Sequence, residues 1–287
     1  DRDSFTFTRD LEAWTESTTL KYNGTSIAEI QVHKNRTFKF RFILKALMKF
    51  IKEQKLTTET FGITAEKAIC DMFNIEVPEN YKGRYSNIIQ KQMEPAIQEA
   101  FKHLPKAIRS TGAEQGERGA NSKCSYDFVL EGEKTMSLKT TINGSMICPP
   151  EVGQPGARTC YVYFGHLVDE TIITESNFKQ MVLENVANMF PIYLNHLLDS
   201  DYLLWIYKKK EEYNYKIFDA DFAKSMVWDP EKFSFSKPSI LDWNESNTLK
   251  YDGISIGEFQ VHKARSSFKF RFNMVNLEKV ITANRTK

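Results

Sequence analysis

The alternation of apolar and polar residues is most informative near the middle of the chain. Residues 126–130 form a short apolar run that contains one acid, Asp127, and Gly132 follows as a turn residue. Over residues 135–141 apolar and polar side chains alternate, which is the spacing of a strand with one buried face. If these two runs pair as a hairpin, Asp127 and Lys139 point into the same cleft.

A similar alternation occurs twice more, once near each end of the chain. Residues 14–33 align without a gap with residues 243–262, and the similarity continues into an identical Phe-Lys-Phe-Arg-Phe run at 38–42 and 268–272. The pairs Asn23-Gly24 and Asp252-Gly253 are typical of two-residue hairpin turns. Each copy of this repeat is therefore predicted to form a three-stranded meander.

The two faces of each meander differ in polarity. In the first copy Ile30 and Val32 fall on the same face as Phe38, Phe40 and Phe42, and we expect this face to form the core. Polar residues occupy the other face, as on any half-buried sheet, but Lys and Arg can also bind phosphates, and Gln and Arg can bind base edges. The candidate DNA-binding residues of the two copies are Gln31, Arg36, Lys39, Arg41, Gln260, His262, Arg265, Lys269 and Arg271.

Apolar residues at helical spacing predict helices between these strands. Thr64 is expected to cap one of them and to put Glu66 in its first turn. Glu66 then either interacts favourably with the positive end of the helix dipole or supplies a carboxylate to a functional site. The predicted helices cover residues 43–55, 64–73, 86–104 with a kink at Pro95, and 176–190 up to Pro191. The other predicted elements are a strand at 159–164, a hairpin of 203–208 with 213–218, and a linker-like segment at 222–238.

These elements predict an α/β fold, in which a central mixed β-sheet is flanked by helices and extended by β-meanders near both termini. We expect an N-terminal β-meander copy at residues 1–42, a core at 43–220, and a C-terminal β-meander copy at 221–287 that packs on the core. The N-terminal copy is either a second working element or a non-functional remnant of the duplication.

The amino-acid composition argues against several kinds of functional site. With 39 Lys and Arg against 37 Asp and Glu, the net charge is only +2, so any nucleic-acid surface must be a local patch. The 4 cysteines form no Cys-x-x-Cys pair and the 5 histidines no His-Glu-x-x-His motif, which argues against structural zinc and favours reduced thiols in the cytoplasm. The sequence contains no P-loop motif, no Gly-x-Ser-x-Gly nucleophile elbow and no apolar run long enough to span a membrane.

The stretch around Asp127 and Lys139 resembles the PD-(D/E)xK nucleases, and the type II restriction endonucleases in particular. That family places an acid on one strand and an acid-x-Lys motif on the next. Asp127 matches the first acid and Lys139 matches the lysine. Ser137 stands where the second acid is usual, as in a minority of restriction enzymes that carry Ser-x-Lys and take the missing carboxylate from elsewhere. The resemblance covers residues 57–164.

The resemblance implies an enzyme that hydrolyses double-stranded DNA at a short recognition sequence, with Mg²⁺ as its cofactor and 5′-phosphate ends on its products. It also implies a homodimer, with no membrane partner and no small-molecule cofactor. Asp127 and Glu66 are expected to bind the metal, with Glu151 as the second choice for the extra carboxylate. Lys139 is expected to orient or help deprotonate the attacking water and to stabilise charge on the phosphate, and Ser137 to position that water.

Three alternatives stay open. The glycine-rich loop that ends in Asn121, Ser122 and Lys123 is either a flexible connection or a backbone clamp on DNA phosphates. A second catalytic pattern, an acid followed by Glu-x-Gln, occurs at Asp252, Glu258 and Gln260. The chain could also be a non-enzymatic, sequence-specific DNA-binding protein that uses its duplicated meanders, with the Asp127–Lys139 hairpin as an ordinary strand pair.

Overall fold

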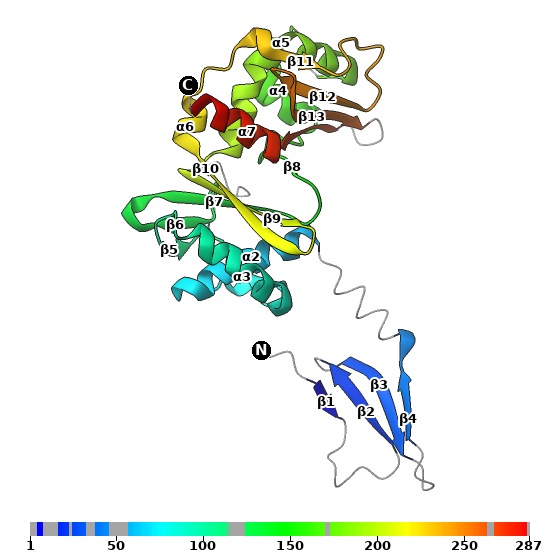
Figure 1. Cartoon of the computed structure of the whole chain (residues 1–287). Helices are drawn as coiled ribbons and strands as arrows, with labels where there is room; N and C mark the ends of the chain where they lie inside the picture. Colours follow the sequence, from blue (N-terminus) through cyan, green and yellow to red (C-terminus); the bar gives the residue numbers. More distant parts are fainter. Residues whose placement is uncertain are drawn as a thin grey trace. The chain divides into compact units, whose positions relative to one another are not determined.

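The computed structural model describes residues 5–7, 17–22, 25–32, 38–45, 57–112, 114, 124–169, 173–262 and 267–285. The chain forms two compact units, Asp1–Glu59 and Thr60–Lys287. Figure 1 draws both units, with colours that run from blue at the N-terminus to red at the C-terminus. None of the helices in the described ranges combines the length and apolarity that a membrane span requires.

The first unit contains a four-stranded antiparallel sheet in the order β1-β2-β3-β4. Its strands are β1 (Phe5–Phe7), β2 (Ser17–Tyr22), β3 (Thr25–Val32) and β4 (Phe38–Phe42). The predicted meander is therefore present and gains a strand at its start. The helix predicted over residues 43–55 lies almost entirely outside the described residues.

The phenylalanines of β4 do not form the expected core. Phe38, Phe40 and Phe42 are 78%, 49% and 57% exposed, whereas Ile27 and Ala28 are buried. The prediction of a core at these rings is wrong for this copy. An open sheet buries only the face that a second layer covers, and among the described residues of this unit no such layer lies on β4.

The second unit is built on a mixed five-stranded sheet in the order β10-β9-β7-β6-β5. Its strands are β5 (Ala107–Ser110), β6 (Phe128–Leu130), β7 (Thr135–Thr141), β9 (Tyr202–Lys209) and β10 (Glu212–Asp219). β7 and β9 are parallel, and the other neighbours are antiparallel. Both predicted hairpins are present, and the predicted mixed sheet with flanking helices is confirmed.

Each face of this sheet is covered by its own core. Helices α2 (Thr58–Phe73) and α3 (Asn87–Ala100) cover one face (Figure 1). The sheet residues in that core include Met136, Leu138, Leu204 and Ile206. The other face packs against helix α5 (Glu175–Leu197) through Leu203 and Trp205. Alternate residues of β9 therefore belong to different cores, as the pleat of a strand requires, whereas β7 contributes Met136 and Leu138 to the core under α2 and α3.

The C-terminal meander belongs to this same unit. Its sheet, in the order β11-β12-β13-β14-β8, consists of β11 (Phe233–Phe235), β12 (Ser246–Tyr251), β13 (Ile254–His262), β14 (Ser267–Asn273) and β8 (Met146–Ile147). It repeats the N-terminal sheet closely, because both copies shift register at the same place, after Leu20 and after Leu249. Asp252 and Gly253 have φ values of 50° and 76°, as a tight hairpin turn requires.

In this second copy the phenylalanines are buried. Phe268, Phe270 and Phe272 are at most 4% exposed. The Phe178 ring of α5 stacks on Phe268 at 4.3 Å, and Tyr193 of α5 lies 4.4 Å from Phe270. Helix α5 is thus the second layer that the described part of the first copy lacks. The remaining helices are α4 (Ala157–Phe164), α6 (Ala220–Ser225) and α7 (Met274–Arg285), with short 3-10 turns η2 (Glu79–Tyr81), η3 (Glu131–Glu133), η4 (Gly165–Leu167) and η5 (Pro230–Lys232).

Two predicted helix boundaries are wrong. α2 begins at Thr58, so Thr64 is not its cap; the Thr64 hydroxyl donates to the Thr60 carbonyl at 2.6 Å, inside the helix. Glu66 therefore lies in the middle of α2, where a helix dipole gives it no special stabilisation. α5 continues past Pro191 to Leu197 with an irregular residue at Asn185, because the apolar residues beyond the proline are buried.

Two further segments differ from the prediction. Residues 159–164, predicted as a strand from their β-branched and aromatic residues, form helix α4. Its buried residues Cys160 and Phe164 are spaced four apart, and this packing overrides strand propensity. Residues 222–238 are more than a linker, because Phe233–Phe235 pairs with β12 as the extra strand of the meander.

Candidate active site

The two strands that carry the expected motif pair as a hairpin. β6 and β7 are antiparallel, with Phe128 opposite Met136. Gly132 in the turn has a φ of 74°, which glycine adopts without strain. The backbone N–H of Asp127 donates to the Met136 carbonyl at 2.9 Å. Asp127 is therefore held beside β7 by the hairpin itself.

Asp127, Ser137 and Lys139 form one line of contacts. Oδ2 of Asp127 accepts a hydrogen bond from the Leu138 backbone N–H at 2.6 Å and a longer one from the Ser137 hydroxyl at 3.4 Å. The Lys139 ammonium donates to the Ser137 hydroxyl oxygen at 3.0 Å. Ser137 is buried, whereas Asp127 and Lys139 are half-buried. The two charged ends of this line are therefore partly open to solvent.

Lys139 has no carboxylate partner among the residues that the structure describes. The buried Lys179 of the same unit does have one, because it pairs with Glu175 at 2.7 Å. An ammonium group that is bound only by a neutral hydroxyl keeps most of its attraction for an anion. Lys139 is thus available to a phosphate group.

The start of β7 is fixed by residues just before its parallel neighbour, β9. Asp201 accepts hydrogen bonds from the Thr135 backbone N–H and hydroxyl, both at 2.8 Å, and pairs with Lys134 at 2.7 Å. Burial alone would raise the pKa of Asp201, but the hydrogen bonds from Lys134 and Thr135 outweigh it and lower the pKa below its usual range. Ser137 is held in the same way, because its backbone N–H donates to the Ser200 hydroxyl at 3.2 Å.

Glu66 has a hydrogen-bond partner in a tyrosine that the sequence analysis placed only in a loop. The buried hydroxyl of Tyr81 donates a hydrogen bond to Oε2 of Glu66. Burial, followed by the negative charges of Glu66 and Asp127, raises the pKa of Tyr81 well above its usual value. The charges of both carboxylates therefore affect the pKa of the same hydroxyl. No local pattern around Tyr81 marks it, because its partners come from distant segments.

Gly112 lies against the same tyrosine. A Cβ atom at Gly112 would overlap the Tyr81 hydroxyl, so only glycine fits here. The neighbouring Thr111 backbone N–H donates to the Asp127 carbonyl at 3.0 Å. The start of the glycine-rich loop is thereby tied to the Asp127 strand. Three DNA-binding candidates of this loop, Asn121, Ser122 and Lys123, lie outside the described residues.

Glu151 has a different set of contacts. Its Oε2 accepts a hydrogen bond from the Tyr163 hydroxyl at 2.7 Å and lies 3.8 Å from His196 Nδ1. Neither partner contacts Asp127, Ser137 or Lys139. Glu66 is therefore the better placed of the two acids that were considered as the additional carboxylate.

The candidate site offers carboxylates as possible metal ligands. Within the described ranges, no three or more His, Cys, Asp or Glu side chains come together as a metal site. Mg²⁺ often takes only one or two protein carboxylates and completes its shell with water and substrate phosphates. Asp127 and Glu66 are carboxylates of this kind, and each is held by a hydrogen bond, from the Leu138 N–H and from the Tyr81 hydroxyl.

Several polar side chains on the C-terminal meander already bind one another. Arg271 pairs with Glu258 at 2.5 Å, and Gln260 Nε2 donates to the same carboxylate at 3.1 Å. In the N-terminal copy Gln31 donates to Glu29 in the equivalent way, at 3.2 Å. The remaining cations of these faces, Lys269, Lys39 and Arg41, are half-buried or exposed. The positions Arg36 and Arg265 and the side chain of His262 lie outside what the structure describes.

The alternative catalytic pattern does not assemble. Glu258 lies opposite Thr248 in the strand register, whereas Asp252 is in the turn. Four residues of strand separate the two acids along β12, a distance of about 13 Å. One metal ion cannot bind both carboxylates directly at that separation.

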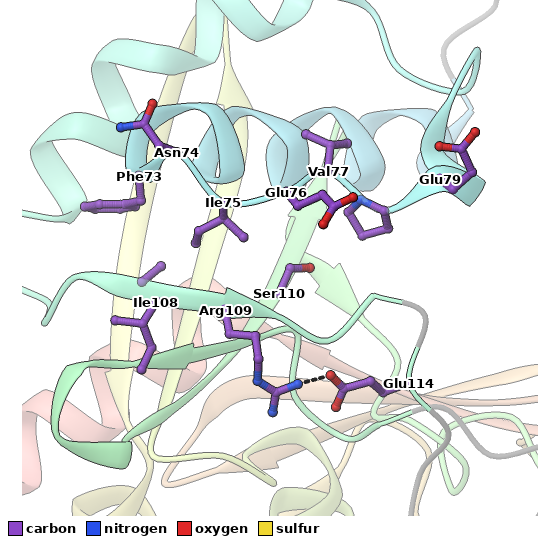
Figure 2. A pocket seen from close by; sticks show the side chains of 12 residues that line it. Phe73, Asn74, Ile75, Glu76, Val77, Glu79, Ile108, Arg109, Ser110 and Glu114 are labelled. Carbon is purple, nitrogen blue, oxygen red and sulfur yellow. Dashed lines mark hydrogen bonds and ion pairs between the residues drawn. The ribbon is translucent and has the colours of Figure 1, made fainter.

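A cavity of about 680 Å³ opens beside the edge strand β5 (Figure 2). Its walls are residues 73–79, residues 107–110 and Glu114. Arg109 forms an ion pair with Glu114, which leaves Glu76 and Glu79 as the other charged groups of the wall. The net negative charge makes this cavity a poor site for a DNA phosphate.

The fold and the site thus define a mixed α/β protein with an acid, a serine and a lysine on adjacent strands. Comparison with characterised proteins finds a similarity to the type II restriction enzyme CviAII of Paramecium bursaria Chlorella virus 1. The two sequences are 24% identical over 225 residues, which cover 77% of this chain and 60% of that enzyme. The chain therefore spans less than two thirds of its relative. No known family profile matches the chain, and no solved structure matches it.

Proposed function

We propose that the protein is a type II restriction endonuclease that hydrolyses double-stranded DNA at a short recognition sequence. The similarity to CviAII supports the enzyme class. The line of contacts among Asp127, Ser137 and Lys139 carries the proposal. It joins an acid beside β6 to an ammonium group on β7 that has no carboxylate partner among the described residues. In this proposal the core is a PD-(D/E)xK nuclease domain of the Ser-x-Lys type.

Each residue of the site would have its own role in hydrolysis. Asp127 and Glu66 would hold Mg²⁺, which when bound would polarise the scissile phosphate and offset its developing charge. Lys139, as an ammonium group, would orient the attacking water and stabilise the charge on the phosphate. The Ser137 hydroxyl, which already accepts a hydrogen bond from Lys139, would help to position that water. The products would carry 5′-phosphate ends.

Ser137 brings no charge, so the metal needs a carboxylate beyond Asp127. Glu66 is our first choice because of its link to Tyr81, and Glu151 is the second. Titrating Mg²⁺ against cleavage by Glu66→Gln and Glu151→Gln separates the two. We expect only Glu66→Gln to raise the Mg²⁺ requirement, and unchanged metal dependence in both variants would exclude both acids.

The DNA surface would be the polar face of the C-terminal meander. Lys269 and Arg271 would contact phosphates, and Gln260, His262 and Arg265 would contact base edges. The same roles would fall in the first copy to Gln31, Arg36, Lys39 and Arg41. Since symmetric cutting of a duplex needs two active sites, a homodimer in the cytoplasm is part of the proposal.

A non-enzymatic DNA-binding protein is the competing function, favoured by the two meanders with matching polar faces. Incubating a plasmid with the protein in Mg²⁺ or in EDTA separates the two functions. Discrete fragments in Mg²⁺ and none in EDTA would support the nuclease. Binding to DNA without cleavage in either condition would favour the competing function.

A further inference from the structure

The strongest remaining feature is the hydrogen bond from Tyr81 to Glu66, one of the two candidate metal-binding acids. Tyr81 closes the turn η2 in the connection from α2 to α3, and its side chain is only 5% exposed. Its hydroxyl donates to Glu66 and packs against Gly112. A buried tyrosine in a connecting loop usually needs a partner for its hydroxyl, and here the partner is an acid of the site.

The loop that carries Tyr81 is fixed from both sides. The Tyr81 backbone N–H donates to the Pro78 carbonyl at 2.9 Å, and the Tyr81 carbonyl accepts from the Arg84 N–H at 3.0 Å. Further along, the Ser86 N–H donates to the Thr64 hydroxyl of α2 at 3.0 Å. The ring is therefore a rigid support and not a side chain that moves freely.

The hydrogen bond itself restricts the carboxylate. The Tyr81 hydroxyl donates to Oε2 of Glu66, and the close approach of Gly112 limits how far this hydroxyl can move away. A hydrogen bond to an ionised acceptor is stronger than one between neutral groups, so the contact favours one orientation of the Glu66 carboxylate.

We propose that Tyr81 is a positioning residue that holds the Glu66 carboxylate ready for the metal ion. The proposal rests on the proposed function of the Asp127–Glu66 pair. Tyr81 itself neither binds the metal nor touches the reacting atoms. Its role resembles that of the hydrogen-bonding partners that orient metal ligands in other sites, whose loss typically lowers metal affinity about 10–100-fold.

The test is direct Mn²⁺ binding to the full chain without DNA, measured by electron paramagnetic resonance, with Mn²⁺ in place of Mg²⁺. We expect Tyr81→Phe, which keeps the ring and removes only the hydroxyl, to weaken Mn²⁺ binding about 10–100-fold. The chain offers a matched control in Tyr163→Phe, which removes the equivalent hydrogen bond to Glu151. That variant should bind Mn²⁺ like the wild type.

A double-mutant cycle separates positioning from general destabilisation. If Tyr81 acts through Glu66, adding Tyr81→Phe to Glu66→Gln causes no further loss of Mn²⁺ binding. Equal losses in both backgrounds would mean that Tyr81 only supports the fold, and the inference would be overturned. Wild-type affinity in Tyr81→Phe would overturn it as well.

Failure of the inference differs from failure of the proposed function. Plasmid cleavage by the wild-type protein, together with wild-type Mn²⁺ affinity in Tyr81→Phe, rejects only the role of Tyr81. Absence of both cleavage and Mn²⁺ binding in the wild-type protein rejects the nuclease site itself, and with it the role of Tyr81.

Discussion

At the scale of single residues, the candidate active site depends on Lys139, whose ammonium group forms no ion pair with a described carboxylate. Among the described residues, Lys139 donates only to the Ser137 hydroxyl, and the loss of one such half-buried hydrogen bond costs about 1 kcal/mol of stability. We therefore expect Lys139→Ala to abolish cleavage while it leaves the fold and specific DNA binding nearly unchanged. Gel-shift binding and plasmid digestion, compared in one preparation, test this prediction.

The comparison needs a lysine that is equally charged but tied to a carboxylate elsewhere. Lys216, which pairs with Glu278 at 3.0 Å, serves as that control. Lys216→Ala should cut DNA like the wild type. Cleavage by Lys139→Ala at a near wild-type rate would remove Lys139 from the active site.

Much of the hairpin site was predictable, because its parts are close in the sequence. Asp127 and Lys139 are joined by a short hairpin whose turn and alternation are local signals. The contact between Glu66 and Tyr81 was not predictable, since it depends on how α2 and the following loop pack. Glu66 itself was proposed from a family resemblance, while its local environment was misjudged by one helix boundary.

At the scale of elements, Asp201 joins the starts of the parallel strands β7 and β9. Asp201→Asn should destabilise the second unit by about 1–2 kcal/mol near neutral pH, because it removes the charge that accepts from Lys134 and Thr135. The pKa of Asp201 is lowered in the folded state. Its stabilising contribution is therefore complete above the unfolded value, near pH 4, and is lost as the pH falls through the lower folded value.

Urea unfolding at pH 7 and at pH 3 measures this effect. The difference between wild type and Asp201→Asn should shrink at pH 3. The exposed Asp242, in the turn before β12, provides a control, and Asp242→Asn should change stability little at either pH. A constant difference for Asp201→Asn at both values would contradict the pKa argument.

The duplicated meanders provide a matched pair of phenylalanines in the same Phe-Lys-Phe-Arg-Phe run. Phe270 is 1% exposed beneath α5, whereas its counterpart Phe40 is 49% exposed. Phe270→Ala should lower the free energy of unfolding by about 3–5 kcal/mol, and Phe40→Ala should change it by about 0.5 kcal/mol or less. Urea unfolding followed by circular dichroism, fitted with one transition for each unit, tests the pair. A similar loss in both variants would mean that Phe40 is covered in solution.

At the scale of the whole molecule, a net charge of +2 leaves little general attraction for DNA. Binding must then depend on individual cations, and Lys269 has no carboxylate partner among the described residues. Lys269→Ala should weaken binding to all sequences and reduce the slope of log affinity against log salt by about 1. Salt titrations with cognate and random duplexes measure both quantities.

Lys279 on α7 is exposed and lies outside the meander face, so Lys279→Ala is the control for this prediction. It should leave the slope unchanged. The same titration on Lys39→Ala shows whether the N-terminal copy also binds DNA. An unchanged slope in Lys269→Ala would mean that the C-terminal meander has only a structural role. The DNA surface would then be sought in the loop before Asp127.

Local periodicity is enough to predict several features of this protein. The Asp127–Lys139 hairpin, the meander repeats and the mixed sheet with its helices follow from alternation, turn residues and helical spacing. Packing between distant elements sets which apolar face is buried, because identical strands carry buried rings under α5 and exposed rings in the described part of the first unit. It also decided which acid meets Tyr81, because side chains far apart in the chain meet only when helices and sheets pack.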